Sequence, residues 1–306
     1  MASYLVTGGC GFVGRHLCRS LLAKGDEVVV LDNLSNSKRD GLVSGCGFLN
    51  GDVRNPEDVA SALRGVDGVF HLAAVASVEL CNQHWRESHL TNQAGSVTVF
   101  ETAAKLGVPR VVYASSAAVY GDTAVIPTDE RTIPAPLTAY GVDKLGTEHH
   151  AAVAARVHGL STVGIRPFNI YGPGQDPHSP YSGVISIFVS RLRAGDSVTI
   201  YGDGMQSRDF IHVSDIVELF KAAMTRPIKA GTVINGASGH STTINELLQL
   251  LAALLLREPR IVHAESRTGE IRHSLGSTEL MASVLGVKPM VTLKDGLQAM
   301  ISEARV

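Results

Sequence analysis

A tyrosine and a lysine, Tyr140 and Lys144, stand four residues apart. Residues at this spacing are neighbours on one face of a helix. A tyrosine with its ordinary pKa of about 10 is a poor base at neutral pH, but an adjacent cation favours its phenolate. Tyr140 is therefore a candidate general base, and Ser115 and Ser116 are hydroxyls that can donate to a substrate oxygen and relay a proton. Taken singly, each feature also fits a solvated helix face or a turn.

Three glycines form a second group, Gly8, Gly11 and Gly14, after an expected strand and at the start of an expected helix. In such a turn the first glycine permits the tight bend, the second lets backbone amides approach a pyrophosphate, and the third lets helix and strand pack closely. A second expected strand ends at Leu31. Asp32 follows it, where a carboxylate accepts from a ribose diol and repels a 2′-phosphate, which favours NAD over NADP.

The elements that must position these groups alternate between Val- and Leu-rich runs and amphipathic stretches, which indicates a parallel sheet built from strand-helix-strand units. Strands are expected at 4–7, 27–31, 48–49, 68–72, 110–114 and 162–166, with helices at 13–24, 56–63, 92–106 and 140–157. Later helices are expected at 184–193 and 213–224, and later strands at 198–201 and 233–235. Asn55 before Pro56 predicts a helix start, and Thr243 with Glu246 predicts a capping box.

The fold class predicted by this order is α/β, a Rossmann-like doubly wound parallel sheet with a smaller carboxyl-terminal α/β lobe. A chain of 306 residues is long enough for about two domains. Three prolines and two glycines between 171 and 182 mark the expected boundary. Residues 1–170 are therefore expected to form the NAD-binding domain and residues 171–306 the substrate lobe, with segments around 206–240 returning to the first domain.

Charge and composition exclude several other classes of protein. A net charge of -2, from 27 basic and 29 acidic residues, provides no positive field for nucleic acid or anionic lipid. Neither a signal peptide nor a membrane segment is expected. The four cysteines lack pairing or zinc-like spacing, which predicts reduced thiols in a cytoplasmic protein, and the histidines lack partners at ligand spacing, so no metal site is expected.

Several longer motifs resemble one known family. They are Thr7-Gly8-Gly9-x-Gly11-Phe12-Val13-Gly14, His71-Leu72-Ala73-Ala74, Ser115-Ser116-x-x-Val119-Tyr120-Gly121, Tyr140-x-x-x-Lys144, Arg166-x-Phe168-Asn169-x-Tyr171-Gly172 and Arg208-Asp209-Phe210-Ile211-His212-Val213. In this order they resemble an extended short-chain dehydrogenase/reductase, and within that group a UDP-hexose 4-epimerase. The resemblance extends over essentially the whole chain.

The resemblance implies a catalytic set of Ser116, Tyr140 and Lys144. Tyr140 would take the proton of the sugar C4 hydroxyl as hydride passes to NAD, giving a transient 4-keto sugar that is reduced on its other face. Lys144 would also hold the nicotinamide ribose. The other cofactor contacts are expected at Gly8, Gly11, Phe12, Val13, Gly14, Asp32, Asn33, Asp52, Val53, Leu72, Ala73, Ala74, Asn92, Ser115, Tyr140 and Pro167. Of these, Asp52 has an equal interpretation as a residue at a helix entry.

The same resemblance implies where a UDP-sugar would bind. The expected contacts are Ala76, Ser77, Ser116, Tyr140, Asn169, Tyr201, Arg208, Arg267 and Ser274. Arg208 and Arg267 would hold the diphosphate and Tyr201 the uracil. Ser274 falls where epimerases restricted to plain hexoses carry a tyrosine, and Ser77 can hydrogen-bond an amide. These two small residues favour interconversion of UDP-N-acetylglucosamine and UDP-N-acetylgalactosamine over glucose and galactose alone.

Three other interpretations remain open. A nucleotide-sugar dehydratase and a UDP-glucuronate epimerase share the scaffold, but a dehydratase needs an acid beside the serine, where this chain has Ala117 and Ala118. The triplet Thr128-Asp129-Glu130 matches a dehydratase motif, and we expect it to be a surface segment. A non-catalytic NAD-binding sensor would have no use for the catalytic set. The family also implies a homodimer through the helices at 92–106 and 140–157, and polysaccharide biosynthesis is an expected use of the product.

Overall fold

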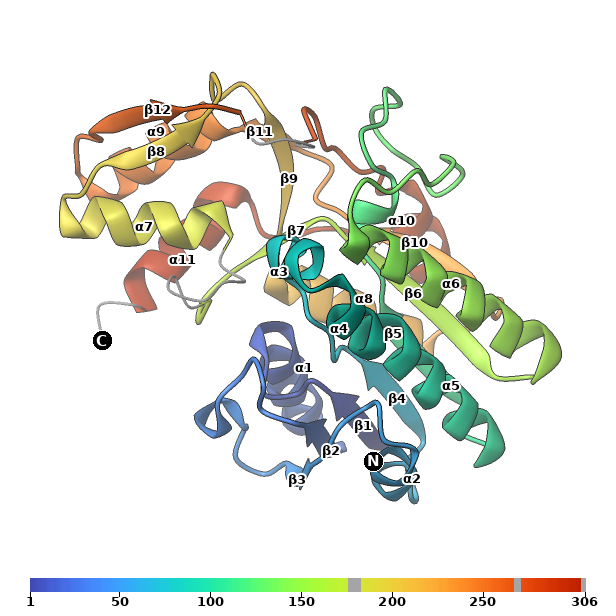
Figure 1. Cartoon of the computed structure of the whole chain (residues 1–306). Coiled ribbons are helices and arrows are strands. Elements are labelled where there is room, and N and C mark those ends of the chain that lie inside the picture. The colour runs from blue at the N-terminus through green and yellow to red at the C-terminus, as the bar shows by residue number, and fades with distance from the viewer. Residues whose placement is uncertain (176–182, 267–270, 304–306) are drawn as a thin grey trace.

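The computed structural model describes residues 1–175, 183–266 and 271–303. Within these residues the largest sheet has seven parallel strands in the order β10-β6-β5-β4-β1-β2-β3 (Figure 1). Their bounds are β1 Ser3–Thr7, β2 Glu27–Asp32, β3 Gly47–Asn50, β4 Gly68–His71, β5 Arg110–Ala114, β6 Ser161–Pro167 and β10 Thr232–Gly236. The expected Rossmann-like α/β fold is confirmed.

Helices cover both faces of this sheet, which makes it doubly wound. One face packs against α2 (Pro56–Ala62), α5 (Gly95–Lys105) and α6 (Ala139–Val157). The other packs against α1 (Phe12–Ala23), α8 (Val213–Thr225) and α10 (Glu279–Leu285). Because both faces are covered, central strands such as β4 and β5 are almost continuously apolar and buried.

The second lobe has its own small sheets and its own core. One sheet has the order β11-β9-β7 and the other pairs β12 with β8. The strands are β7 Asn169–Tyr171, β8 Val198–Tyr201, β9 Ser207–His212, β11 Ser241–Thr243 and β12 Ile261–Ala264, and the helices are α7 Val184–Ala194, α9 Ile244–Leu255 and α11 Leu293–Glu303. Apolar residues of α7, α9 and α11 form the core of this lobe with β8 and β9.

The chain returns to the first lobe after visiting the second. Helix α8 packs against α1, and β10 pairs with β6 in parallel register, Ile234 opposite Ile165. In Figure 1 the strand β10 lies beside β6, although β8 and β9, which precede it in the sequence, belong to the other lobe. The boundary between domains at residue 170 remains a prediction.

Local sequence signals explain where several helices begin. Asn55 caps α2 by accepting from Glu57 N at 3.0 Å, with Pro56 at the first helical position, as expected. The predicted capping box at α9 is confirmed: Thr243 accepts from the Glu246 backbone at 3.1 Å, and Glu246 accepts from Thr243 N at 2.8 Å.

Other expectations need correction. The expected single helix over 92–106 is wrong at its start, because a π-helical turn (η2, Leu90–Ala94) precedes α5. Two short helices, α3 (Val78–Gln83) and α4 (Trp85–His89), and two 3₁₀ turns, η1 (Arg39–Gly41) and η3 (Ala117–Val119), were not expected. Cys10, Cys18, Cys46 and Cys81 are free thiols. In the described part of the chain, no helix combines the length and apolarity that crossing a bilayer requires.

Candidate active site

The glycine turn joins β1 to α1 beneath the end of β4. Gly8 has a left-handed φ of +70°, and a Cβ there would lie 2.8 Å from the Ala73 nitrogen, so only glycine fits. A Cβ at Gly14 would run into the Gly8 carbonyl oxygen. Gly11 is the N-cap of α1 and brings no side chain to the amides of the first turn at Phe12 and Val13. This cradle of bare backbone amides fits the pyrophosphate of a dinucleotide.

Asp32 lies at the end of β2, over the glycine turn. Its Oδ2 accepts from Cys10 N at 3.1 Å, and its Oδ1 accepts from Leu34 N and Ser37 Oγ, both at 2.9 Å. These bonds fix the orientation of the carboxylate and tie the end of β2 to the turn. The position at the strand end fits the predicted ribose contact.

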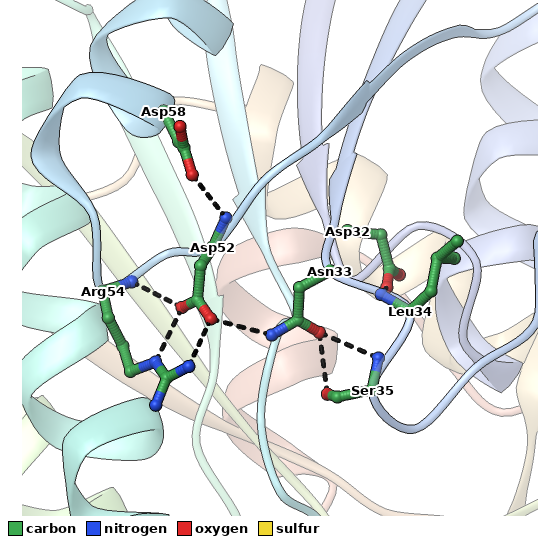
Figure 2. A network of polar contacts seen from close by, with 7 residues as sticks. All are labelled: Asp32, Asn33, Leu34, Ser35, Asp52, Arg54 and Asp58. Atoms are coloured by element: carbon green, nitrogen blue, oxygen red, sulfur yellow. Dashed lines mark hydrogen bonds and ion pairs between the residues drawn. The ribbon is translucent and has the colours of Figure 1, made fainter.

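Asn33 connects Asp32 to the predicted adenine side of the site (Figure 2). Its Nδ2 donates to Asp52 Oδ2 at 2.9 Å. Arg54 donates to both Asp52 oxygens, and these hydrogen bonds hold the pKa of Asp52 at about 2. Asn55 is the cap of α2, and Asp52 lies at the entry to this helix, because its O accepts from Asn55 N at 2.9 Å and its N donates to Asp58 Oδ2 at 2.8 Å; its predicted cofactor contact stays a prediction. Val53 follows it and is buried.

His71 holds the end of β4 in place beside β1. Its Nδ1 lies 2.8 Å from Thr7 Oγ1 and its Nε2 2.9 Å from Ser96 Oγ. Ser96 donates its own proton to the Asn92 carbonyl, so Nε2 is assigned as the donor and Nδ1 as the acceptor. Burial lowers the pKa of His71 to about 3. Thr7 Oγ1 also accepts from the backbone of Leu72 and Ala73, at 3.2 Å each, which positions the predicted cofactor contacts 72–74.

Asn92 lies in the π-helical turn and is fully buried. Its Oδ1 accepts from Val75 N at 2.7 Å, and its Nδ2 donates to Val75 O at 3.1 Å. Both functional groups of the amide are therefore committed to the segment after β4. The geometry assigns Asn92 to the support of this segment, and its predicted cofactor contact remains untested.

Tyr140, Lys144 and Ser116 converge at the carboxyl end of β5. Lys144 Nζ donates to the Ala114 carbonyl at 2.8 Å and lies 5.7 Å from the centre of the Tyr140 ring. Ser116 is the N-cap of η3, where its Oγ accepts from Ala118 N at 3.1 Å, and it lies close enough to Tyr140 to act on the pKa of that phenol. The three predicted catalytic residues are thus neighbours at the sheet edge where ligands bind in doubly wound folds.

Burial dominates the protonation of this group. It raises the pKa of Tyr140 to about 12, with the hydrogen bond from Ser116 acting in the opposite direction. Desolvation of the phenolate is the largest effect on Tyr140 in the protein alone, and the stabilisation of the phenolate by Lys144 together with a bound nicotinamide stays a prediction. Burial also lowers the pKa of Lys144 to about 8, while Asp143, Cys81 and Glu148 oppose that shift.

Glu148 is a buried carboxylate that the motifs did not single out. It accepts from Ser115 Oγ, and Arg166 Nε and Nη2 donate to its two oxygens at 2.8 and 2.7 Å. The guanidinium of Arg166 lies 4.7 Å from the centre of the Tyr120 ring. The Ser115 hydroxyl therefore points to Glu148 and its backbone N donates to Ile165 O, which leaves the backbone carbonyl for any cofactor contact. A sequence signal existed, because Tyr140, Lys144 and Glu148 recur every four residues along one helix face.

The predicted substrate contacts lie mainly around β7, β8 and β9. Asn169 is exposed in β7, and Tyr201 is partly buried at the end of β8. Arg208 Nη1 donates to the carbonyls of Ser207 and Ile271, at 2.9 and 2.8 Å. Ser274 N donates to Ser207 O at 3.1 Å, so the predicted gate residue runs beside β9. Arg267 lies outside the described residues.

Asp209 organises the loops around Ser274. It is fully buried in β9 and accepts from Ser238 N and Ser238 Oγ, both at 2.7 Å, from Gly239 N at 3.0 Å and from Gly276 N at 3.2 Å. One carboxylate thus joins the loop after β10 to the segment that carries Ser274.

Three further predicted contacts lie at the ends of strands or helices. Ala76 is exposed after β4, and Ser77 is buried as the N-cap of α3, where its Oγ accepts from Leu80 N at 3.2 Å. In this cap the hydroxyl oxygen accepts and its proton is not used, so the predicted hydrogen bond of Ser77 to an amide stays a prediction. Pro167 ends β6 and is opposite Gly236 of β10.

The segment Thr128-Asp129-Glu130 is not the surface loop that we expected. Thr128 is buried, its N donates to Leu275 O at 2.8 Å, and its O accepts from Ser277 N at 2.8 Å. Glu130 Oε1 accepts from Asn235 N at 2.7 Å. Thr128 instead holds the segment that contains Ser274 through these two backbone hydrogen bonds. The polar composition of the triplet gave no sign of its burial, because the partners are distant in the sequence.

Among the described residues, no cluster of three or more His, Cys, Asp or Glu side chains is arranged to hold a metal ion.

The sequence and the structure were compared with known protein families and solved structures. The model of the NAD dependent epimerase/dehydratase family matches residues 4–236. Three solved structures cover at least 99% of this chain and 98% of their own. They are a Thermotoga maritima UDP-glucose 4-epimerase with UDP-glucose (34% identity, TM-score 0.95), a Methanobrevibacter ruminantium UDP-N-acetylglucosamine 4-epimerase with UDP-N-acetylmuramic acid (31%, 0.94) and a Thermus thermophilus UDP-glucose 4-epimerase with NAD (34%, 0.92).

Proposed function

The chain belongs to the NAD-dependent epimerase/dehydratase family, as one of the UDP-hexose epimerases of the extended short-chain dehydrogenase/reductases, and we propose that it interconverts UDP-N-acetylglucosamine and UDP-N-acetylgalactosamine. It is an NAD-dependent isomerase. UDP-glucose and UDP-galactose are the second candidate pair, favoured by the similarity to the Thermotoga maritima enzyme.

The observation that carries the proposal is the convergence of Ser116, Tyr140 and the buried ammonium of Lys144 at the carboxyl end of β5. When bound, NAD supplies a hydride acceptor and donor for the sugar C4. Tyr140 takes the proton of the C4 hydroxyl and later returns it, and Ser116 donates to the same oxygen. Lys144, fixed by the Ala114 carbonyl, stabilises the Tyr140 phenolate. With NAD bound, the sugar would pass through a 4-keto form and would be reduced on the opposite face.

Substrate choice rests on small and cationic side chains. Ser274 stands where a tyrosine would restrict the sugar pocket, and its small side chain leaves room for a 2-acetamido group. Arg208 offers a planar fork to the diphosphate, Asn169 binds near it, and Tyr201 offers a ring to uracil. Arg267 is proposed as a second diphosphate anchor.

The alternatives fit the site less well. A dehydratase needs an acid beside Ser116, where η3 carries Ala117 and Ala118. Glu130 is already bonded to the Asn235 backbone, away from that role. A UDP-glucuronate epimerase uses the same catalytic set and differs in its sugar pocket. A sensor would not require Ser116, Tyr140 and Lys144 together.

We also propose a homodimer that pairs α5 and α6 of each protomer, and a cytoplasmic location consistent with four free thiols. The product would serve the synthesis of a polysaccharide.

Incubation of the purified protein with UDP-N-acetylglucosamine, UDP-glucose and UDP-glucuronate, followed by NMR of the C4 configuration, tests the function. We expect epimerisation of the N-acetylated sugar at unchanged mass. A loss of water in the mass spectrum would indicate a dehydratase, and exclusive turnover of UDP-glucuronate would indicate the uronate enzyme.

The Ser274→Tyr variant tests substrate choice in the same assay. A tyrosine fills the space for the acetamido group, so kcat/KM for UDP-N-acetylglucosamine should fall by at least about a hundredfold, as expected for a steric pocket change. Turnover of UDP-galactose by the same variant serves as the internal control and should persist. Equal loss of both activities would reject Ser274 as the gate.

A further inference from the structure

A buried brace of three side chains, Ser115, Glu148 and Arg166, lies directly behind the catalytic edge. All three are nearly inaccessible, with exposed fractions of 2%, 6% and 5%. Glu148 accepts from the hydroxyl of Ser115 and from two nitrogens of Arg166. It thereby joins α6, β5 and β6 at a single carboxylate. The proposed reaction assigns no proton transfer to this carboxylate, whose printed partners are Ser115 and Arg166.

The brace acts on the short segment that carries Ser116. The segment is already tied to β6 through Ser115 N, which donates to Ile165 O at 2.7 Å, and to α6 through Lys144, which donates to Ala114 O. The Ser115 hydroxyl adds a second tie to α6 at Glu148. Since Ser116 is the next residue, the rotation of this backbone determines where its hydroxyl lies relative to Tyr140.

We propose that Glu148 is a positioning residue of the epimerase, which keeps Ser116 against Tyr140 by holding Ser115 and Arg166 at the end of the sheet. This inference rests on the proposed catalytic role of Ser116.

The chemistry of the brace supports this role. A carboxylate that accepts a hydroxyl and a two-pronged guanidinium makes short, strongly directional bonds, which fix geometry better than neutral pairs do. A buried ion pair is by itself a weak source of stability, since apolar replacements of the same shape are often as stable. Control of the position of the Ser116 hydroxyl is a reason for a buried ion pair at this place.

Ser115→Ala tests the brace without uncovering a charge, because Arg166 continues to pair with Glu148. We expect kcat to fall about tenfold, as for a small misplacement of a catalytic group. The KM for the UDP-sugar, the retention of NAD and the melting temperature should stay near the wild-type values. Ser115→Thr keeps the hydroxyl and should restore most of the lost kcat. Glu148→Gln keeps the shape and should lower kcat in the same way.

Ser161→Ala is the matched control. Ser161 also joins a strand of this sheet to an arginine, because its Oγ accepts from Arg110 Nε at 3.0 Å, but it lies at the opposite end of the sheet. Its loss should leave kcat unchanged.

Combination with Ser116→Ala separates positioning from general support. If Ser115 acts through Ser116, then Ser115→Ala should add no further loss in that background, measured as the single-turnover rate of bound cofactor reduction. A wild-type kcat in Ser115→Ala, an equal loss in both backgrounds, or a loss confined to melting temperature would overturn the proposal. An inactive wild-type protein would instead reject the proposed function itself.

Discussion

The ammonium-bearing residue Lys144 is almost completely buried, with an exposed fraction of 3%. Its pKa of about 8 results from burial, and the nearby groups Asp143, Cys81 and Glu148 favour the ammonium. The ammonium is anchored on the Ala114 carbonyl and faces the Tyr140 ring. At neutral pH Lys144 therefore carries the positive charge that a phenolate at Tyr140 requires.

Tyr140→Phe removes the proposed base and little else. Because the hydroxyl transfers a proton in the reacting geometry, we expect kcat to fall by at least about a thousandfold, within the usual range for a general base. NAD should remain bound, measured by release of the dinucleotide on denaturation.

Tyr4→Phe is the control for that variant. Tyr4 is also buried, but it lies in β1 at the amino end of the sheet, far from the strand ends that form the site. Its turnover should match the wild type. Measurable epimerisation by Tyr140→Phe would remove this residue from the role of base.

At the scale of elements, His71 joins β1, β4 and α5 through the hydroxyls of Thr7 and Ser96. The pKa of His71 is lowered from 6.5 to about 3, so the folded protein keeps it neutral while the unfolded chain takes up a proton below pH 6.5. The free energy of unfolding therefore falls as the pH decreases from 6.5 towards 3.

This histidine alone should cost about 2 kcal/mol between pH 6.5 and about pH 5, at about 1.4 kcal/mol per pH unit. Urea unfolding of the wild type and of His71→Gln at both pH values measures the effect. The variant should be less stable at neutral pH but should show a flatter decline. His150→Gln, at an exposed site on α6, should decline like the wild type, and an unchanged slope in His71→Gln would contradict the assignment.

The sequence predicted those helices and strands that depend on residues close to them in the chain. The cap at Asn55, the capping box at Thr243 and the Val-rich strand of residues 110–114 needed only near neighbours, and these predictions are confirmed. Strand β9 escaped prediction because Ser207 and Asp209 are polar and are buried only by partners from distant segments.

The same limit applies to the candidate site. The spacing of Tyr140 and Lys144 and the glycine turn pointed to the site from sequence alone, and the roles of these residues remain predictions. The link from Ser115 to Glu148 spans 33 residues and the link from Asp209 to Gly276 spans 67, so neither produces a local pattern. Long-range polar contacts of this kind become visible only when the sheet brings strand ends together.

At the scale of the molecule, α6 has three exposed valines on one side, with the exposed His149 between two of them. Val142 and Val153 are 53% and 48% exposed, and Val157 is 70% exposed. Val142 and Val153 are separated by about three helical turns, so they share a face, and Val157 continues it. Figure 1 shows α5 and α6 together along one side of the molecule.

Val153→Asp tests the proposed dimer. A charge in an apolar interface would be desolvated without a partner, so the variant should sediment as a monomer where the wild type sediments as a dimer. Val262→Asp, at a similarly exposed valine of β12 in the other lobe, should keep the wild-type mass. A monomeric wild type would contradict the dimer.

The return of the chain to β10 has a consequence for how the protein is made. Strand β6 finds its outer neighbour only after the polypeptide has run through the first part of the second lobe, about 65 residues later, so a ribosome must synthesise beyond residue 236 before the nucleotide lobe can close its sheet. Until then β6 remains an open edge, which is the kind of surface that pairs with other nascent chains. The two lobes therefore mature together during synthesis, although each has its own core.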